Sequence, residues 1–340
     1  MYAAYITVLS PGAPAAATSS SRAPRSTAYG GYRRYAGKLH GWPHYMVLLP
    51  VIALLISSVV AQTTPDSDSG TGLLTVVQDV ARETGPINVK LAPFLARGDG
   101  VSDDTAALQR AIDVAGRPGP TFARNRAGVG RAVYFPAGVY VVLHPLTVQS
   151  SRQGCDPHCQ GGPDCVFNCH PPVSFTGDGL HMSVIKANRT MEAVLIFNST
   201  GQTKPGKPSY LTQSHEVSGL TFDGGMVANH SVFARGIVGS HFRAVGFHNA
   251  LISGAALGYG WINNIFECDF HGNGIVGLLC DNNPNSVNIV DSNFDENGAG
   301  IIVSSGAMVR IEGNCMEGNT GPGIIANNIR SLNIRANYFE

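Results

Sequence analysis

The chain has 340 residues, and its 23 lysine and arginine residues are balanced by 23 aspartate and glutamate residues. There is no overall basic field of the kind that attracts nucleic acid, so we expect no nucleic-acid partner. Glycine is abundant at 41 residues and charged residues make up only 14% of the chain. This composition favours many turns and a surface rich in Asn, Ser, Thr and Gly.

The N-terminal part differs from the rest, because its first acidic residue is Asp66. Residues 1–45, rich in Ala, Ser, Pro, Arg and Tyr, predict a low-complexity basic leader or cytosolic tail. Residues 46–61 form an apolar run of 16 residues, fewer than the roughly 20 that a membrane-spanning helix needs. The run predicts the core of a cleaved signal peptide or an uncleaved signal anchor, with a buried core segment as the third alternative. A polar linker, residues 62–85, follows.

Either export signal would place the remainder outside the cytosol, secreted or anchored as a type II protein. Membrane contact would then occur only through residues 46–61. Glycosylation motifs agree with export, since Asn-X-Ser/Thr acceptors occur at Asn188, Asn198 and Asn229.

Four of the seven cysteines cluster in one short segment, at Cys155, Cys159, Cys165 and Cys169. In an oxidising compartment this pattern favours two local disulfides, and the sequence leaves their pairing open. A zinc site that includes His158 and His170 is the alternative. The other three cysteines, Cys268, Cys280 and Cys315, make the total odd, so at least one thiol is expected to be free.

A helix is predicted after the segment R-G-D-G-V-S-D-D-T, residues 97–105. Ser102 or Asp103 is suited to cap it by accepting hydrogen bonds from free N–H groups of the first turn. Its apolar face is expected to comprise Ala107, Leu108, Ala111, Ile112 and Ala115. After a loop rich in Pro and Gly, residues 133–142 (VYFPAGVYVV) predict a strand, a turn and another strand.

These two segments resemble the opening of proteins of the pectate-lyase superfamily, of the rhamnogalacturonase/epimerase-like type. The resemblance covers residues 86–340 and implies a right-handed parallel β-helix whose N-terminal end is capped by the helix. It implies a fold rather than a reaction, because this fold carries lyases, hydrolases, epimerases and non-catalytic proteins. Asp103 and Asp104 are interpreted as structural residues of the helix start.

The last third of the chain repeats at intervals of 22–25 residues, which predicts an all-β solenoid. The repeat is carried by the apolar anchors Phe222, Phe247, Phe270, Phe294, Met316 and Phe339. A second apolar side chain lies five residues before each anchor, at Val217, Phe242, Ile265, Ile289, Ile311 and Ile334. Both sets are expected inside the solenoid, where each buried side chain contributes about 1.5–3 kcal/mol.

Amide side chains recur on both sides of the anchors. Asn273, Asn297 and Asn319 follow the anchors, whereas small and amide side chains, at Ser292, Asn314 and Asn337, lie two residues before them. The preceding positions predict a tight bend in which Asn adopts a left-handed conformation. Stacked amides are expected to form hydrogen bonds between coils.

Titratable residues directly follow every anchor, at Asp223, His248, His271, Asp295, Glu317 and Glu340. Since neighbouring side chains in a strand point to opposite faces, we expect this row to face outward. It is either a solvated surface or a groove for a sugar polymer. In the second case Asp223, His248, His271, Asp295 and Glu317 are the candidate catalytic residues.

Two reactions suit such a row. Glycoside hydrolysis needs two carboxyl groups, which Asp295 and Glu317 on adjacent coils can supply. However, the N-T-D and G-H-G motifs of polygalacturonases are absent, and Arg310-Ile311-Glu312 departs from their R-I-K motif.

Lyase chemistry removes the proton next to a uronate carboxyl group. The resemblance implies Ca²⁺ as a cofactor, with Asp269, Asp291, Asp295 and Glu296 as candidate ligands. Arg243, Arg310 and Arg335 are the candidate base or substrate-binding residues.

The sequence thus predicts an exported protein that acts on an acidic, pectin-like polysaccharide or cell-wall glycan as a lyase or hydrolase. The alternative is a non-catalytic adhesive, binding or structural β-helix. The chain ends at Glu340, directly after an anchor, and we therefore expect it to be a piece of a longer β-helix.

Overall fold

The computed structural model describes residues 6–9, 85–116, 131–150, 172–199, 202–204, 207–208 and 212–340. Most of residues 1–45, all of residues 46–61 and the cysteine cluster at 155–169 lie outside these ranges, as does the linker apart from its last residue. Within the described ranges, no helix is both long and apolar enough to cross a membrane. The leader, anchor and disulfide predictions therefore stay predictions.

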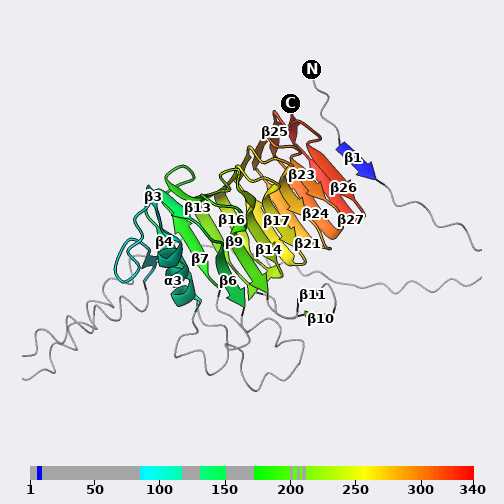
Figure 1. The fold of residues 1–340 in the computed structure, drawn as a ribbon. Helices are drawn as coiled ribbons and strands as arrows, with labels where there is room; N and C mark the ends of the chain where they lie inside the picture. Colours follow the sequence, from blue (N-terminus) through cyan, green and yellow to red (C-terminus); the bar gives the residue numbers. More distant parts are fainter. Residues whose placement is uncertain are drawn as a thin grey trace, which may run out of the picture. The chain divides into compact units, whose positions relative to one another are not determined.

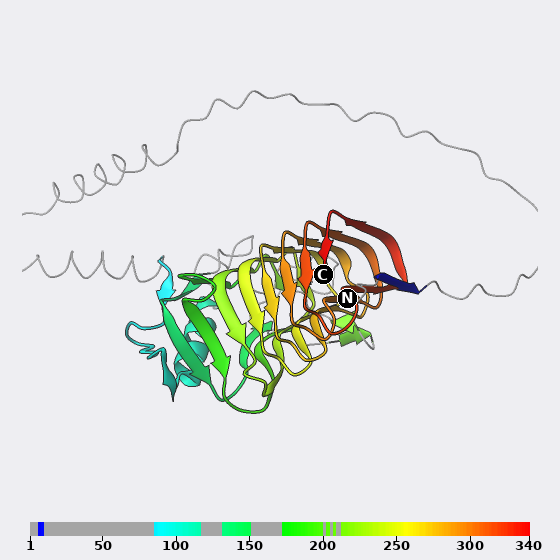
Figure 2. The same ribbon diagram turned by 90° about the horizontal axis from the view of Figure 1, so that it is seen from above.

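The fold is a right-handed parallel β-helix, as predicted, in which strands of successive coils stack side by side into one 8-stranded and one 18-stranded sheet (Figures 1 and 2). Sheet 1 runs in the order β6 (Leu146–Ser150), β9 (Met191–Ser199), β14 (Ala228–Arg235), β17 (Ser253–Gly258), β20 (Val276–Cys280), β23 (Ile301–Val303), β26 (Ile324–Asn327) and β1 (Ile6–Leu9). All its pairings are parallel.

The remaining strands form two further parallel stacks, which share β13 (Glu216–Asp223) and β16 (His241–His248). Sheet 2 contains β2 (Ile87–Asn88), β4 (Ala132–Phe135), β7 (Ser174–Gly177), β18 (Trp261–Phe266), β21 (Asn285–Val290), β24 (Gly306–Glu312) and β27 (Ile329–Arg335), with the short strands β12 (Thr212–Gln213) and β15 (Ile237–Val238). Sheet 3 contains β3 (Asp99–Asp103), β5 (Gly138–Val142), β8 (Ser183–Ala187), β19 (Asp269–His271), β22 (Asn293–Asp295), β25 (Cys315–Glu317) and β28 (Tyr338–Phe339). A separate antiparallel pair is formed by β10 (Gln202–Lys204) and β11 (Lys207–Pro208).

The anchors lie in the core, as their spacing predicted. Phe222, Phe247, Phe270 and Phe294 are almost completely buried and in register on successive coils. The ring of Phe270 stacks between Phe247 and Phe294, with centroids 4.7 and 4.5 Å away. Each coil therefore places one aromatic ring on the next, and this stack fixes the register of sheet 3.

In each coil, residues with a left-handed backbone conformation form two corners. These corners separate the short strands of sheet 3 from sheets 1 and 2. Before the anchor, the left-handed residues are Gly219, Ala244, Glu267, Asp291, Gly313 and Ala336, and after it they are Asn249, Gly272, Glu296 and Gly318. The predicted left-handed bend is present, but the amide residue itself does not adopt it. The residue one position earlier does, because the amide side chain must point inward.

The amide ladders form as expected. Asn297 is fully buried, and its Oδ1 accepts hydrogen bonds from the backbone N–H and Nδ2 of Asn273 at 3.1 and 2.8 Å. Its own Nδ2 donates to the carbonyl of Phe270. Asn314 makes the corresponding contacts at the other corner, accepting from the backbone N–H of Ser292 and donating to the carbonyl of Ile289.

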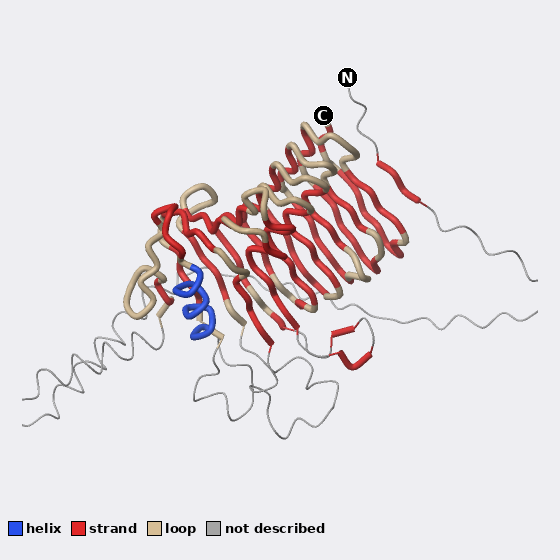
Figure 3. Tube along the Cα trace, in the orientation of Figure 1, coloured by secondary structure: helices blue, strands red, loops and turns tan. Residues whose placement is uncertain are grey.

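The predicted helix is α3 (Thr105–Ala115), and its five predicted apolar residues are buried in the core. It lies at one end of the stack, beside β4 and β6, and it is the only helix among the described residues (Figure 3). Its assignment as the cap of the solenoid stays a prediction.

The expected hydrogen bond to the start of the helix is made by Asp103 but not by Ser102. The helix begins after Asp104, whose side chain makes no capping bond. Asp104 instead accepts hydrogen bonds from the backbone N–H groups of Arg97 and Gly98 at 2.6 and 2.9 Å. Asp103 accepts from the N–H of Thr105, whereas the Ser102 hydroxyl donates to Asp99. Asp104 is therefore structural, since it fixes the turn that precedes the helix.

Candidate functional site

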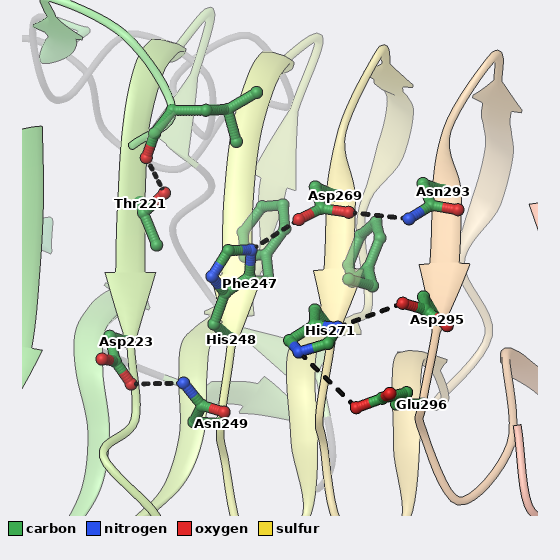
Figure 4. Close-up of polar contacts among 12 residues, drawn as sticks. Thr221, Asp223, Phe247, His248, Asn249, Asp269, His271, Asn293, Asp295 and Glu296 are labelled. Carbon is green, nitrogen blue, oxygen red and sulfur yellow. Dashed lines mark hydrogen bonds and ion pairs between the residues drawn. The ribbon is translucent and has the colours of Figure 1, made fainter. Parts of the chain in front are cut away.

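The outward row of sheet 3 is continuous in register, from Lys186 through Asp223, His248, His271 and Asp295 to Glu317. We call these six residues the acid–imidazole row. A second outward row precedes the anchors and contains Thr221, Gly246, Asp269, Asn293 and Cys315. Contacts between the two rows define the candidate site (Figure 4).

Among the described residues, His248 and Asp269 form the shortest contact between a histidine and a carboxylate. Nε2 of His248 lies 2.7 Å from Oδ2 of Asp269, although the residues belong to successive coils. Nδ2 of Asn293 donates to the other carboxylate oxygen at 3.0 Å. Gly246 leaves room for the imidazole, because a Cβ at this position would lie 3.0 Å from Nε2 of His248.

The environment of Asp269 keeps it ionised. Its partial burial would raise its pKa, but hydrogen bonds from His248 and Asn293 and the nearby imidazoles of His248 and His271 outweigh this and lower the pKa. A carboxylate held in this way orients the ring that donates to it. Asp269 therefore orients the ring of His248. The sequence did not predict that these two residues are partners.

His271 lies between two carboxylates of the following coil. Its Nδ1 is 3.3 Å from Oδ2 of Asp295, and its Nε2 is 3.8 Å from Oε2 of Glu296. The rings of His248 and His271 are 5.8 Å apart and nearly perpendicular. The two imidazoles are thus neighbours with different partners.

Asp223 is engaged at the other end of the row. Its Oδ1 accepts hydrogen bonds from Nδ2 of Asn249 at 3.1 Å and from the N–H of Gly225 at 2.8 Å. Nζ of Lys186 lies 3.5 Å from its Oδ2. Lys186 is half-exposed and brings a positive charge into the row. The repeat did not predict Lys186 as part of the row, because this residue lies one coil before the first anchor.

A loop between β7 and β8 borders the row. The hydroxyl of Thr221 donates to the carbonyl of Leu180, which fixes this loop against sheet 3 (Figure 4). The exposed ring of His181 then lies 6.3 Å from that of His248. No repeat signal marks this loop, so the sequence could not place His181 near the row.

The three candidate arginines lie on sheet 2 rather than in the row. Arg243 pairs with Glu267 at 3.0 Å, and both Arg310 and Arg335 pair with Glu312. Hydrogen bonds from Arg335 and Arg310 lower the pKa of Glu312. These arginines line the neighbouring face, and their role in substrate binding stays a prediction.

The candidate calcium ligands do not converge. Asp291 lies at the corner between sheets 2 and 3, whereas Asp295 and Glu296 face His271 and Asp269 faces His248. Within the described residues, no group of three or more His, Cys, Asp or Glu side chains is arranged to hold a metal ion. Calcium binding stays a prediction.

The three cysteines within the described residues, Cys268, Cys280 and Cys315, are free thiols. Burial raises the pKa of the Cys268 and Cys280 thiols to about 12, and burial also raises that of Cys315. They are therefore poor nucleophiles. Of the glycosylation motifs, Asn188 is exposed and Asn229 is half-buried in β14, while the side chain of Asn198 lies outside the described part.

Comparison with known proteins identifies the family to which the chain belongs. Residues 87–337 match the family model described as rhamnogalacturonase A/epimerase, pectate lyase-like. The chain belongs to this family, which confirms the resemblance found in its opening motif.

Two curated relatives have different activities. A probable glucan endo-1,3-beta-glucosidase of Arthroderma benhamiae is 32% identical over 133 residues, 39% of this chain. The mannuronan C5-epimerase AlgE3 of Azotobacter vinelandii is 31% identical over 254 residues, 70% of this chain. The chain spans only 12% of the length of each relative.

A solved structure supports the fold alone. The N-terminal fragment of gene product 12 of bacteriophage phi29 matches with a TM-score of 0.50 and 16% identity, over 78% of this chain and 45% of that one.

Proposed function

We propose that the protein modifies an acidic polysaccharide by acid–base chemistry at the acid–imidazole row. The observation that carries this proposal is the pair of imidazoles one coil apart, each in contact with a carboxylate. The reaction class is removal of the proton next to a uronate carboxyl group, the step that a lyase and a C5-epimerase share. The epimerase relative supports this class.

His248 is the proposed base. Since a carboxylate only accepts hydrogen bonds, the contact with Asp269 fixes the proton of the neutral ring on Nε2. Its Nδ1 then carries the lone pair that takes the substrate proton. Asp269 stabilises the imidazolium that forms, while Asn293 holds Asp269 in position.

His271 is the proposed acid. Asp295 and Glu296 face both of its ring nitrogens, and only the protonated ring can donate from both. A proton from His271 would reach the leaving oxygen in an elimination, or the opposite face of the carbanion in an epimerisation. Lys186 supplies positive charge in the same row for the substrate carboxylate.

Hydrolysis of a neutral β-glucan is the second candidate. The carboxylates Asp295 and Glu296 beside His271, with Glu317 one coil further along the row, favour it, because a neutral chain is not repelled by them. Two of them would act as the acid and the nucleophile or base. The glucanase relative supports this candidate.

The test is a substrate panel of polygalacturonate, alginate and a linear β-1,3-glucan. We would follow unsaturated uronate, inverted C5 centres and new reducing ends separately. The proteins compared are the wild type, His248→Gln and Asp113→Asn. Asp113→Asn is the control, because it changes an exposed residue of the helix. We expect reaction on a uronate polymer that His248→Gln abolishes and Asp113→Asn retains. Reducing ends from β-glucan alone would establish the second candidate, and no reaction on any polymer would favour a non-catalytic β-helix.

A further inference from the structure

A third imidazole lies beside the acid–imidazole row, on the turn between β7 and β8. The ring of His181 is 6.3 Å from that of His248, which is itself 5.8 Å from the ring of His271. β8 stands two strands before β16 in the stack, so the turn reaches across β13 to bring this ring close. His181 is exposed, and it makes no ion pair within the described part of the chain. Its imidazole is therefore open to solvent and to a ligand.

The turn that carries this ring is held firmly by its neighbours. The Asp178 carboxylate accepts hydrogen bonds from the hydroxyl of Tyr134 at 2.6 Å and from the backbone N–H of Ala137 at 2.8 Å. The carbonyl of Met182 accepts one from the N–H of Gly138 at 2.7 Å. These bonds fix the backbone on both sides of the imidazole. A fixed backbone under an exposed polar side chain suits a binding group, which must be in place before the ligand arrives.

The turn lies on the side of His248 from which the proposed base would act. The Thr221 hydroxyl ties the carbonyl of Leu180 to β13. Gly246 is the next residue in that outward row, and it has no side chain to separate the turn from the imidazole. Nε2 of His248 is directed toward the following coil, and Figure 4 shows the other ring nitrogen on the side of β13. The lone pair of the proposed base therefore lies on the side that His181 borders.

The other cations of this region are engaged elsewhere. Lys186 stands two strands from His248, roughly 10 Å along the stack, and its Nζ lies 3.5 Å from Oδ2 of Asp223. Arg243 lies on sheet 2, where it pairs with a glutamate. His181 is therefore the group beside the proposed base that can become positively charged and that no carboxylate of the described residues pairs.

We propose that His181 binds the carboxylate of the uronate residue whose C5 proton His248 removes. When Nδ1 of His248 takes this proton, the electron pair of the C5–H bond moves into the carboxylate, which becomes an enolate with two negative charges. The nearby anion favours the protonated form of His181, which donates an N–H to one of these oxygens and stabilises the charge as it develops. In an elimination, the electron pair then forms the C4–C5 double bond as the C4–O bond breaks, and His271 protonates the departing oxygen. In an epimerisation, the pair takes a proton from His271 at C5.

This inference rests on the proposed function, and it makes His181 a determinant of specificity. A free carboxylate would be held by charge, whereas a methyl ester offers no charge for His181 to pair. The test measures kcat and KM of the full chain on whichever of polygalacturonate and alginate reacts, and on the methyl-esterified form of that polymer. The variants are His181→Gln, which removes the charge, and His181→Lys, which restores a cation. Met182→Ala, at the next exposed position of the same turn, is the matched control, and thermal unfolding checks that each protein is folded.

His181→Gln is expected to lower kcat on the free-acid polymer by about 10²-fold, the usual cost of losing one donor to a developing oxyanion, with little effect on the ester. His181→Lys should recover part of this loss, and Met182→Ala should react like the wild type. Wild-type kinetics in folded His181→Gln, or equal losses on acid and ester that lysine does not restore, would overturn the role of His181. The proposed function would still stand if His248→Gln is inactive in the same assay. A wild-type protein that reacts with neither free-acid polymer would overturn both.

Discussion

Nε2 of His248 lies 2.7 Å from Oδ2 of Asp269 because the two side chains meet diagonally across neighbouring coils. Asp269 stands opposite Gly246 in the register, not opposite His248. The missing side chain at Gly246 opens the path between them. A pair separated by 21 residues in sequence thus becomes one functional unit through the parallel stacking of sheet 3.

Replacing Asp269 by asparagine is expected to impair catalysis without unfolding the protein. An amide can present either a donor or an acceptor to His248, so the proton is no longer fixed on Nε2. We expect kcat to fall by about 10²-fold or more, the usual contribution of a positioned acid–base group, with a smaller effect on KM. Steady-state kinetics on the active polymer measures this, with Asp113→Asn as control. A kcat close to that of the wild type would remove Asp269 from the mechanism.

The lowered pKa of Asp269 also predicts how the stability of the protein depends on pH. The pKa of Asp269 is lowered in the folded state, so the carboxylate stabilises the fold above its unfolded pKa of about 3.9. This contribution is lost as the pH falls through the lower, folded pKa. Urea unfolding between neutral and acidic pH should therefore show a smaller loss of stability in Asp269→Asn than in the wild type. Parallel pH profiles of the two proteins would contradict the assignment.

Substitutions of Phe270 and His271, which are neighbours on β19, should lower the stability of the protein by very different amounts. Phe270 is fully buried between two stacked rings, whereas the side chain of His271 is 40% exposed. Phe270→Ala is expected to lower the free energy of unfolding by about 3–5 kcal/mol, and His271→Ala by less than about 1 kcal/mol. Chemical denaturation of both variants tests the inward and outward assignment, which equal losses would refute.

The amide ladder should contribute more than its small side chains suggest. Removing the Asn297 amide leaves the backbone N–H of Asn273 and the carbonyl of Phe270 without their partners in the core. Asn297→Ala is expected to cost about 2–3 kcal/mol, since buried polar groups without partners are expensive. Asn333→Ala, at an exposed position of β27, is the control. Similar unfolding midpoints for both variants would show that the ladder is not a stabilising element.

The sequence predicted the features that repeat. The spacing of Phe247, Phe270 and Phe294 identified the core, and because residues alternate along a strand it also identified the outward row. Amides near the anchors predicted the ladders, although not which residue of the corner is left-handed.

Features that depend on one coil could not be predicted. The Leu180 loop brings His181 to the row by a single hydrogen bond from Thr221, and no repeat marks this contact. The repeat also did not predict the role of Gly277. A Cβ at this position would lie 2.9 Å from Cδ1 of Phe294. The periodicity gave the anchor but not the small residue that faces it across the core.

In the proposed reaction, the acid–imidazole row removes the proton at C5 of a uronate. The most direct measurement is incubation of the wild type and His248→Gln with alginate and polygalacturonate in deuterium oxide, followed by NMR of the polymer and of unsaturated ends. We expect the wild type to incorporate deuterium at C5 or to form unsaturated ends, and His248→Gln to do neither. Unchanged C5 protons and no unsaturated ends with the folded wild type, or equal reaction in both proteins, would contradict it.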